Sequence, residues 1–490
     1  MFKLGLKNYR GFLNEEFIFS RINILIGENS AGKSSIFKFL LALKQSLRIP
    51  NNRDSNLTFS GVDTDLGNYR EAVYNHEAKR NLAFYFEFAD DYFPFFFSQF
   101  FAITFDREEV ILRDSIAERR KKIIKILDGE IAQPTKISFE LTKDLNKHEN
   151  IKMSITNKKI GSIQVIHNES GDLPEQEIYL INDDPTCNIF FTTMGEEYLF
   201  EEVAYEKQGF LSIIRSGSLR NSIESRIKHE KLGKDEKSVI ENIYWRMAYL
   251  LVTQNYIQTQ LSGLEYINPL LSKPAARIYL EGDKKNTRRV GGIEDVVEFL
   301  SANNAQFTDK LSNALNEFGL ANKVYVKSTG FARQLRVIVN GVDSNIKDVG
   351  FGVSLQLPIF TQAIISDGAI KTRNSNAGVR GETLLIEQPE VHLHPQLQAK
   401  FIDALLQISS RNRYIIETHS EHIIRMLQII VKEKRYGIKS SDVSITYLRK
   451  EGRKMVKSFH AIDSESGKLK PLFPKGFYDV SYNLAFELMS

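Results

Sequence analysis

The sequence predicts an α/β fold in which both ends of the chain contribute strands to one mixed sheet. Three observations support this prediction. An apolar strand pattern at residues 22–26 is followed by a glycine-rich loop and a helical pattern at residues 35–47. An alternation of strands and helices resumes after residue 330, and residues 81–204 read mainly as short antiparallel strands separated by turn clusters. A parallel sheet can hold strands that are distant in the sequence, so we expect the two ends to build one domain.

We expect five parts along the chain. The first and fourth form the α/β domain, the second is a mainly antiparallel β insertion, the third is helical, and the fifth is a small C-terminal domain. In chain order these parts span residues 1–80, 81–204, 205–330, 331–440 and 441–490. Within the insertion, residues 115–129 have the pattern of a helix, and the aromatic run at 92–105 reads as buried packing.

The composition is that of an ordinary soluble protein of 490 residues, with 42% hydrophobic and 26% charged residues. The formal net charge of +4 permits nucleic-acid binding without indicating it. Cys187 is the single cysteine, which excludes an intrachain disulfide and favours a reducing compartment. The N-terminus lacks the apolar core of a signal peptide, and residues 92–105 are too short and interrupted to cross a membrane. We therefore expect a cytoplasmic location and no membrane partner.

Residues 27–34, GENSAGKS, match the pattern G-x-x-x-x-G-K-S between a predicted strand and a predicted helix. Glycines let backbone N–H groups curl around phosphates, and the N-terminus of the helix adds a partial positive charge. Lys33 would reach the β- and γ-phosphates, and Ser34 would ligate Mg²⁺. The pattern therefore predicts binding of ATP with Mg²⁺ by a phosphate loop made of Gly27, Glu28, Asn29, Ser30, Ala31, Gly32, Lys33, Ser34 and Ser35.

A phosphate loop needs a carboxylate at the end of a neighbouring strand to hold Mg²⁺. The apolar segment 383–386 ends in Glu387, which we predict to be this carboxylate. A further strand pattern at residues 414–417 leads to His419, whose ring could hydrogen-bond a γ-phosphate oxygen. Upstream, residues 348–358 (DVGFGVSLQLP) combine a glycine- and serine-bearing turn with an apolar helix, which offers a helix N-terminus and a hydroxyl to an anion.

Together these segments resemble the ATP-binding-cassette (ABC) superfamily and, within it, the RecF-like and SMC-like ATPases. The sequence is most similar to bacterial AAA-family ATPases that read EQPE-x-HLHP, then THS, and then continue into a C-terminal domain of unknown function ending near GF-x-D. Matching segments cover roughly residues 1–75 and 335–485. Relatives include the overcoming-lysogenization-defect nucleases and the ATPase subunits of bacterial anti-phage systems.

The resemblance implies a role for each matched position. Residues 27–35 would be the Walker A loop, Glu387 the Walker B acid and His419 the switch histidine. Gly350, Gly352 and Ser354 stand where the family has its signature motif. Families of this kind form an ATP sandwich, in which the signature segment of one chain closes on the nucleotide of the other. The implied partner is therefore a second copy of the chain, in a dimer or a larger homo-oligomer.

The sequence differs from the superfamily pattern at the position that usually holds the catalytic glutamate. Gln388 stands there, and its amide can orient water but cannot accept a proton. Glu390 lies two residues further on, across Pro389, which favours an extended path at Gln388. We predict Glu390 to be a substitute base; the alternative is that Glu390 pairs locally and hydrolysis is very slow.

Other sites are less well supported by the sequence. His392 and His394, with Glu390, suggest a metal site but lack a third well-spaced ligand. The Ser and His residues at 419–422 suggest nucleophile chemistry but lack an evident orienting acid. The basic runs at 118–122 and 284–289 could contact nucleic acid, although such runs more often solvate a helix or loop.

Three classes of function remain open. The first is an ATPase that senses a foreign component and controls an effector, such as a nuclease, in anti-phage defence. The second is an ATPase of DNA repair or recombination that acts directly on DNA. The third is an ATP-bound scaffold that hydrolyses slowly. By analogy with the resembling families, we favour the first, with no nuclease activity in this chain.

Overall fold

The computed structural model describes residues 2–47, 57–88, 135–143, 149–157, 161–168, 175–181, 256–268, 275–280, 290–302, 305–367, 382–409, 412–474 and 487. Several features predicted from the sequence lie outside these residues: the helix at 115–129, the aromatic run, the basic runs at 118–122 and 284–289, and Cys187. In the described part of the chain, no helix is both long enough and apolar enough to cross a membrane.

Backbone contacts divide the chain into two compact units. The first unit comprises Met1–Ile18, Lys38–Ser262 and Gly452–Lys454, and the second comprises Phe19–Phe37, Gly263–Glu451 and Met455–Ser490. The second unit thus combines a short segment near the N-terminus with the C-terminal half of the chain.

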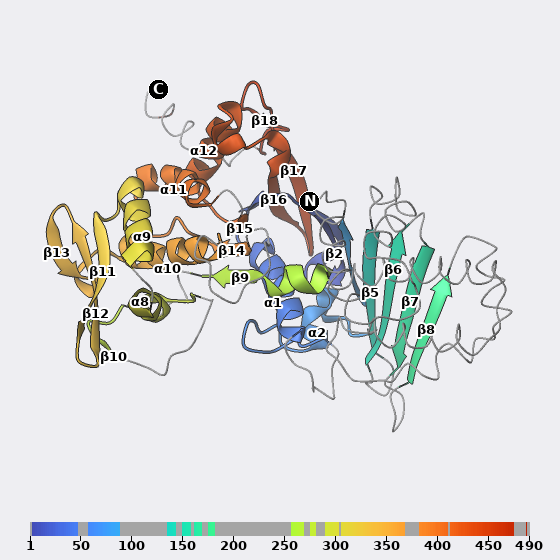
Figure 1. Cartoon of the computed structure of the whole chain (residues 1–490). Helices are drawn as coiled ribbons and strands as arrows, with labels where there is room; N and C mark the ends of the chain where they lie inside the picture. Colours follow the sequence, from blue (N-terminus) through green and yellow to red (C-terminus); the bar gives the residue numbers. More distant parts are fainter. Residues whose placement is uncertain are drawn as a thin grey trace, which may run out of the picture. The chain divides into compact units, whose positions relative to one another are not determined.

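The first unit contains a seven-stranded sheet in the order β2-β1-β4-β5-β6-β7-β8 (Figure 1). Its strands are β1 (Phe2–Tyr9), β2 (Phe12–Phe19), β4 (Leu82–Phe88), β5 (Thr135–Lys143), β6 (Glu149–Asn157), β7 (Gly161–Asn168) and β8 (Glu175–Ile181). Neighbouring strands from β1 to β8 run antiparallel to each other. The alternation of apolar and polar residues that predicted these strands is realised in β4, where Phe84 and Phe86 are buried and Tyr85 faces the other side. The antiparallel β insertion is therefore confirmed.

The second unit contains a seven-stranded sheet in the order β18-β17-β16-β3-β15-β14-β9. Its strands are β3 (Ile22–Gly27), β9 (Leu264–Ile267), β14 (Thr383–Glu387), β15 (Arg413–Glu417), β16 (Val443–Glu451), β17 (Lys454–Ile462) and β18 (Leu469–Lys470). The five strands from β16 to β9 are parallel, whereas β17 and β18 are antiparallel to each other, so the sheet is mixed. Strand β3, from the start of the chain, lies between β15 and β16, from its end. The prediction that both ends build one sheet is confirmed.

Helices accompany this parallel sheet, as expected for strands that are buried on both faces. They are α8 (Ile293–Ala302), α9 (Ala305–Phe318), α10 (Phe351–Ser366), α11 (Pro395–Ile408) and α12 (Glu421–Lys432). Helix α1 (Lys33–Ser46) begins in this unit and belongs to the first unit from Lys38 onward. Helix α10 is apolar on all sides and contacts α8, α9 and α11, and nearly all of its residues after Gly352 are buried.

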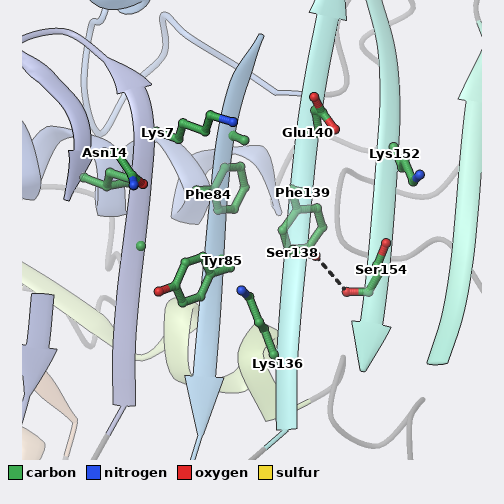
Figure 2. A pocket seen from close by; sticks show the side chains of 13 residues that line it. Lys7, Asn14, Phe84, Tyr85, Lys136, Ser138, Phe139, Glu140, Lys152 and Ser154 are labelled. Atoms are coloured by element: carbon green, nitrogen blue, oxygen red, sulfur yellow. Dashed lines mark hydrogen bonds between the residues drawn. The ribbon is translucent and has the colours of Figure 1, made fainter. Parts of the chain in front are cut away.

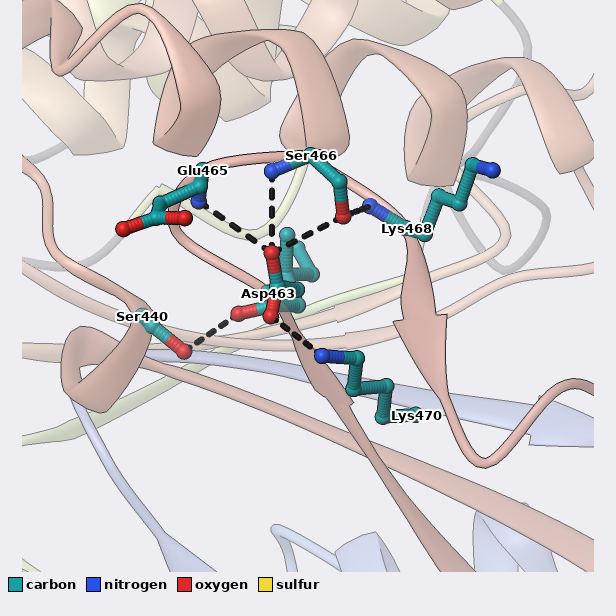
Figure 3. Close-up of polar contacts among 7 residues, drawn as sticks. Ser440, Asp463, Glu465, Ser466, Lys468 and Lys470 are labelled. Carbon is teal, nitrogen blue, oxygen red and sulfur yellow. Dashed lines mark hydrogen bonds and ion pairs between the residues drawn. The ribbon is translucent and has the colours of Figure 1, made fainter.

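In the same unit, the segment 463–470 forms a turn around Asp463, which accepts hydrogen bonds from Ser466 and Lys470 (Figure 3).

The region 205–330, which we expected to be helical, also contributes strands. Helices α8 and α9 lie where the sequence predicts them, but β9, β10 (Tyr279–Leu280) and β11 (Lys323–Thr329) were not expected. Strand β9 is only four residues long, and its place is fixed by parallel pairing with β14. Strands β10 and β11 join β12 (Ala332–Val339) and β13 (Val342–Asn345) in a separate small sheet. Short strands of this kind owe their conformation to their partners more than to their own pattern.

Gly27, at the end of β3, has no room for a side chain. Its φ is +144°, and a Cβ would overlap the carbonyl oxygen of Leu448 on β16. We predict that Gly27→Ala lowers the free energy of unfolding by about 2 kcal/mol or more, because both the backbone angle and the contact must change. Gly350 is the control, because its φ is −59° and nothing beyond its chain neighbours lies within 4 Å of the position that a Cβ would take. Urea unfolding of both alanine variants gives the comparison; equal midpoints would contradict the steric argument.

Candidate functional site

The phosphate loop, residues 27–35, leaves β3 and enters α1 at Lys33. Ser30 and Gly32 have positive φ values of 61° and 89°, which give the loop its tight curl. The Lys33 side chain is buried, and its Nζ donates to the carbonyl oxygens of Gly27 at 3.1 Å and Glu28 at 2.8 Å. Burial lowers the pKa of Lys33, although neighbouring carboxylates oppose this shift. The lysine charge is therefore held inside the loop, where a phosphate would lie.

Strand β15 lies between the strand that carries the phosphate loop and the strand that ends in Glu387. Glu387 and Glu417 are register partners on the parallel strands β14 and β15, and Glu417 is in turn the partner of Leu25 on β3. Glu387 is thus two strand spacings, roughly 10 Å, from the backbone of β3. From the sequence we expected Glu387 to end a strand next to the loop; the adjacent strand is β15 instead.

Glu417 is the carboxylate that contacts the phosphate loop. The Oγ atom of Ser34 lies 3.0 Å from its Oε1 and 2.9 Å from its Oε2, so the hydroxyl can donate to either oxygen. Glu417 is 3% exposed, and burial, followed by the nearby charge of Glu387, raises its pKa to about 7. Sequence patterns did not lead us to this residue. Its signal was an acidic residue closing an apolar strand directly before Thr418 and His419.

Glu387 is held from the far side by β9 and the residue that follows it. Asn268 donates from Nδ2 to Glu387 Oε2 at 2.6 Å and to the hydroxyl of Tyr266 at 3.2 Å. Burial and the charge of Glu387 raise the pKa of Tyr266, so its hydroxyl stays protonated. Asn268 was also missed from the sequence, because it lies 119 residues from its partner.

The side chain of Glu390 contacts the backbone of His419. The N–H of His419 donates to Glu390 Oε1 at 2.6 Å, and Glu390 Oε2 is buried without a hydrogen bond to any described residue. Burial raises the pKa of Glu390, and the hydrogen bond from the His419 N–H, followed by weaker effects that include the charge of Lys33, partly offsets this shift. Partial burial and then the same lysine charge lower the pKa of His419, which favours a neutral ring. Glu390 and His419 are both close enough to Lys33 to feel its charge.

The turn that carries Glu390 begins with an unusual backbone. Gln388 has a φ of +44°, so the extended path that we expected before Pro389 is wrong. The cause is tertiary: the Gln388 N–H donates to Glu417 O at 2.7 Å, and Gln356 on α10 donates to Pro389 O at 2.7 Å. These two bonds fix the turn more strongly than the local preference of a residue before proline.

The segment 350–354 begins α10 and rests on the same turn. A Cβ on Gly352 would lie 3.1 Å from the carbonyl oxygen of His392, and the ring of Phe351 lies 5.7 Å from the His392 ring. Phe351 is 64% exposed, whereas Ser354 is buried and its Oγ donates to Phe351 O at 3.0 Å. Among the described residues, no hydrogen bond joins Ser354 to the phosphate loop of its own chain.

The AAA ATPase domain family matches residues 1–424. The chain belongs to this family. No curated protein sequence matches it. Three solved structures resemble it at 10% sequence identity. The first is the SMC head domain from Thermotoga maritima, with a TM-score of 0.34 over 93% of this chain and 97% of that chain. The second is an SMC head bound to the C-winged helix domain of ScpA, with a TM-score of 0.37 over 94% of this chain and 98% of that chain. The third is an SMC head from Pyrococcus furiosus with an extended coiled coil, bound to the C-terminal domain of ScpA, with a TM-score of 0.35 over 100% of both chains.

The residues at the site fit the ATP and Mg²⁺ that an AAA ATPase domain uses. Mg²⁺ prefers one or two carboxylates together with waters and phosphate oxygens, rather than a cage made only of protein ligands. Ser34, Glu417 and Glu387 supply such a set, and no cluster of three or more His, Cys, Asp or Glu side chains arranged to hold a metal occurs in the described part of the chain. His394, which the sequence suggested as a metal ligand, instead accepts from the Gln396 N–H and caps α11.

Lys33→Ala removes the only positive charge of the phosphate loop. We predict that it lowers ATP affinity roughly a hundredfold or more while the fold survives, because the lysine would face the phosphates and donates hydrogen bonds to Gly27 O and Glu28 O, both within the loop. Binding of a fluorescent ATP analogue measures the change. Lys38→Ala is the matched control, since Lys38 is exposed on the same helix, and it should bind as the parent does. Unchanged affinity in a folded Lys33→Ala protein would contradict the assignment of the loop.

Proposed function

We propose that the chain binds and hydrolyses Mg²⁺–ATP at the carboxyl edge of β3, β15 and β14, and that it associates with a second copy to do so. The observation that supports this most is the position of β15, which brings Glu417 to Ser34 and the N–H of His419 to Glu390. One strand thereby links the phosphate loop to both acidic residues of the 387–390 turn. Bound Mg²⁺ would supply charge neutralisation for the phosphates.

In this proposal each polar group at the edge has a separate task. Lys33 and the loop N–H groups bind and orient the phosphates. Ser34 and the carboxylates Glu387 and Glu417 hold the metal, with Asn268 orienting Glu387. His419 presents its ring to the γ-phosphate while its N–H fixes Glu390.

Glu390 is the proposed general base. Its Oε1 accepts from the His419 N–H, and its Oε2 is buried without a hydrogen bond to a described residue. Oε2 is the oxygen that would accept the proton once ATP and the attacking water are bound. Burial raises its pKa above the usual value of a glutamate, which strengthens it as a base. Gln388, locked in a left-handed conformation at the start of the same turn, can orient water but cannot accept its proton.

Replacing Glu390 by Gln tests the base directly. The amide preserves the shape and can still accept from the His419 N–H, but it cannot take a proton, so turnover should fall roughly a hundredfold while ATP binding persists. Single-turnover hydrolysis and ATP affinity are the two measurements, with Glu421→Gln on α12 as control. Hydrolysis at the parental rate would overturn the role of Glu390 and favour Gln388 or a slow, ATP-held switch.

The segment 350–354 is the surface that we propose the second copy uses. Gly350 leaves space above the N-terminus of α10, Phe351 is exposed, and Ser354 makes no hydrogen bond to its own phosphate loop among the described residues. Such a surface suits the phosphates of another chain's nucleotide, as the resemblance to ATP-binding cassettes implies. Its packing against the 388–392 turn couples that contact to Glu390.

Mixing two defective chains tests the composite site. Lys33→Ala lacks a working phosphate loop, and Ser354→Arg blocks the segment offered to the partner. A mixture of the two should recover part of the ATPase activity, because one site then combines an intact loop with an intact Ser354. A mixture of Lys33→Ala with the double variant Lys33→Ala/Ser354→Arg contains no intact loop and should stay inactive. Full activity in a monomer at every concentration would exclude the composite site.

We further propose that ATP-dependent association controls a partner effector, such as a nuclease, in bacterial anti-phage defence. The support is the resemblance of residues 387–395 and 418–420 to the ATPases of such systems. Purification together with the products of adjacent genes, with and without ATP, tests this. A chain that never retains another protein under either condition would argue for the DNA-repair or scaffold alternatives.

A further inference from the structure

A second polar surface lies on the first unit, on the face of its antiparallel sheet that points away from the core. Alternation along the strands places Leu4, Phe84 and Phe139 on the core side and leaves their sequence neighbours on the outer face. Strand register arranges these neighbours in rows across β1, β4, β5 and β6. One row is Gly5, Tyr85, Ser138 and Ser154; the row on one side contains Lys136, and the row on the other side is Lys7, Ala83, Glu140 and Lys152.

The middle row forms the floor of a hollow of about 280 Å³, because glycine and serine leave space that larger side chains would fill (Figure 2). Tyr85 crosses β1 at Gly5, where any Cβ would overlap its ring, and its hydroxyl donates to Glu16. Lys136 lies over the same ring, with Nζ 3.8 Å from the centroid. Asn14 on β2 adds an amide at the rim.

The charge of the lining is positive. It contains three lysines, Lys7, Lys136 and Lys152, against one carboxylate, Glu140, which leaves a formal +2. Glu140 accepts from Asn81 at 2.8 Å, and neither Lys7 nor Lys152 forms an ion pair with another described residue. Lys3 and Glu87, beside the hollow, form an ion pair, so their charges cancel. An anion would therefore meet a lining of net positive charge, with Glu16 at the Tyr85 hydroxyl and Glu87 opposite Lys136 as the acidic residues at its edge.

The kind of anion follows from the spacing. Lys7 on β1 and Lys152 on β6 are three strand spacings apart, about 14 Å, which exceeds the size of a single phosphate. The rows of Lys136 and of Lys152 are four residues apart along the strands, again about 14 Å. A hollow of about 280 Å³ between these rows has room for part of one strand but not for a duplex, whose major groove alone is about 12 Å wide. Lysine, serine and asparagine are typical partners of backbone phosphates.

We propose that this hollow binds the sugar–phosphate backbone of a single-stranded nucleic acid. The strand lies across β1, β4, β5 and β6, over the glycine–serine floor, with each lysine contacting a different phosphate. The ring of Tyr85 forms one wall. This interface uses none of the residues assigned to ATP and does not depend on that assignment.

The test is fluorescence anisotropy with a labelled oligothymidylate of about 20 nucleotides. The triple variant Lys7→Gln, Lys136→Gln and Lys152→Gln should bind tenfold or more weakly at low salt. The slope of log affinity against log salt should also fall by about 2, since each lost phosphate contact removes about 0.7. The charge-matched control, Lys323→Gln, Lys327→Gln and Lys400→Gln, removes three exposed lysines elsewhere and should bind as the parent does. A parental circular dichroism spectrum and urea unfolding midpoint for each variant confirm that it is folded.

Two further variants distinguish binding in the hollow from nonspecific attraction of the strand to positive charge. Ser154→Leu fills the floor without changing the charge or adding an aromatic ring, and should weaken binding severalfold, whereas replacing the three lysines by arginine should preserve binding. Equal affinity of the lysine triple variant and its control, or full binding by Ser154→Leu, would overturn the proposal. Competition by thymidine monophosphate or inorganic phosphate as effective, per phosphate, as the unlabelled strand would also overturn it, because the site would then recognise a small phosphate instead of a strand.

Discussion

The insertion of β15 between β3 and β14 is the constraint on which the site depends. Parallel strands bring their carboxyl ends to the same edge, so the register Leu25–Glu417–Glu387 decides which side chains can meet there. Asn23, buried within β3, secures this arrangement by donating from Nδ2 to Tyr414 O at 2.9 Å and accepting from the Ser20 N–H at 2.6 Å. The backbone bonds from Thr418 to Leu25 and from Gln388 to Glu417 continue it past the strand ends.

The electrostatic consequence is an edge that favours a divalent cation. Three carboxylates, Glu387, Glu390 and Glu417, interact with one ammonium, that of Lys33, which leaves a formal charge of −2. Burial raises the pKa of both Glu390 and Glu417, and the nearby negative charges of Glu387 and Glu390 raise the pKa of Glu417 further. A Mg²⁺ ion would relieve this repulsion, while the phosphates would occupy the donors of the loop. In the proposed site, metal and nucleotide would therefore stabilise the arrangement together.

Local patterns predicted the parts of the fold whose signals are local. The phosphate loop follows from a fixed spacing between strand and helix, and the antiparallel insertion follows from the period-two alternation seen in β4. Strand order is not a local property, which is why Glu387 was expected beside the loop and Glu417 was overlooked. Gln388 was predicted extended from its proline neighbour, but hydrogen bonds to Glu417 and from Gln356 to Pro389 decide its conformation. Asn268 and the four-residue β9 depend on contacts more than a hundred residues away.

The proposed magnesium site requires that Glu417, on the strand next to the loop, shares the metal with Glu387. The Mg²⁺ dependence of ATP affinity in Glu417→Gln tests this requirement most directly. We predict that affinity in the presence of Mg²⁺ falls about tenfold or more, because a charged ligand is lost beside Ser34. Affinity measured with excess chelator should be unchanged or higher, because one carboxylate no longer repels the phosphates. Parental Mg²⁺–ATP affinity in Glu417→Gln, together with a loss in Glu387→Gln alone, would contradict the shared site.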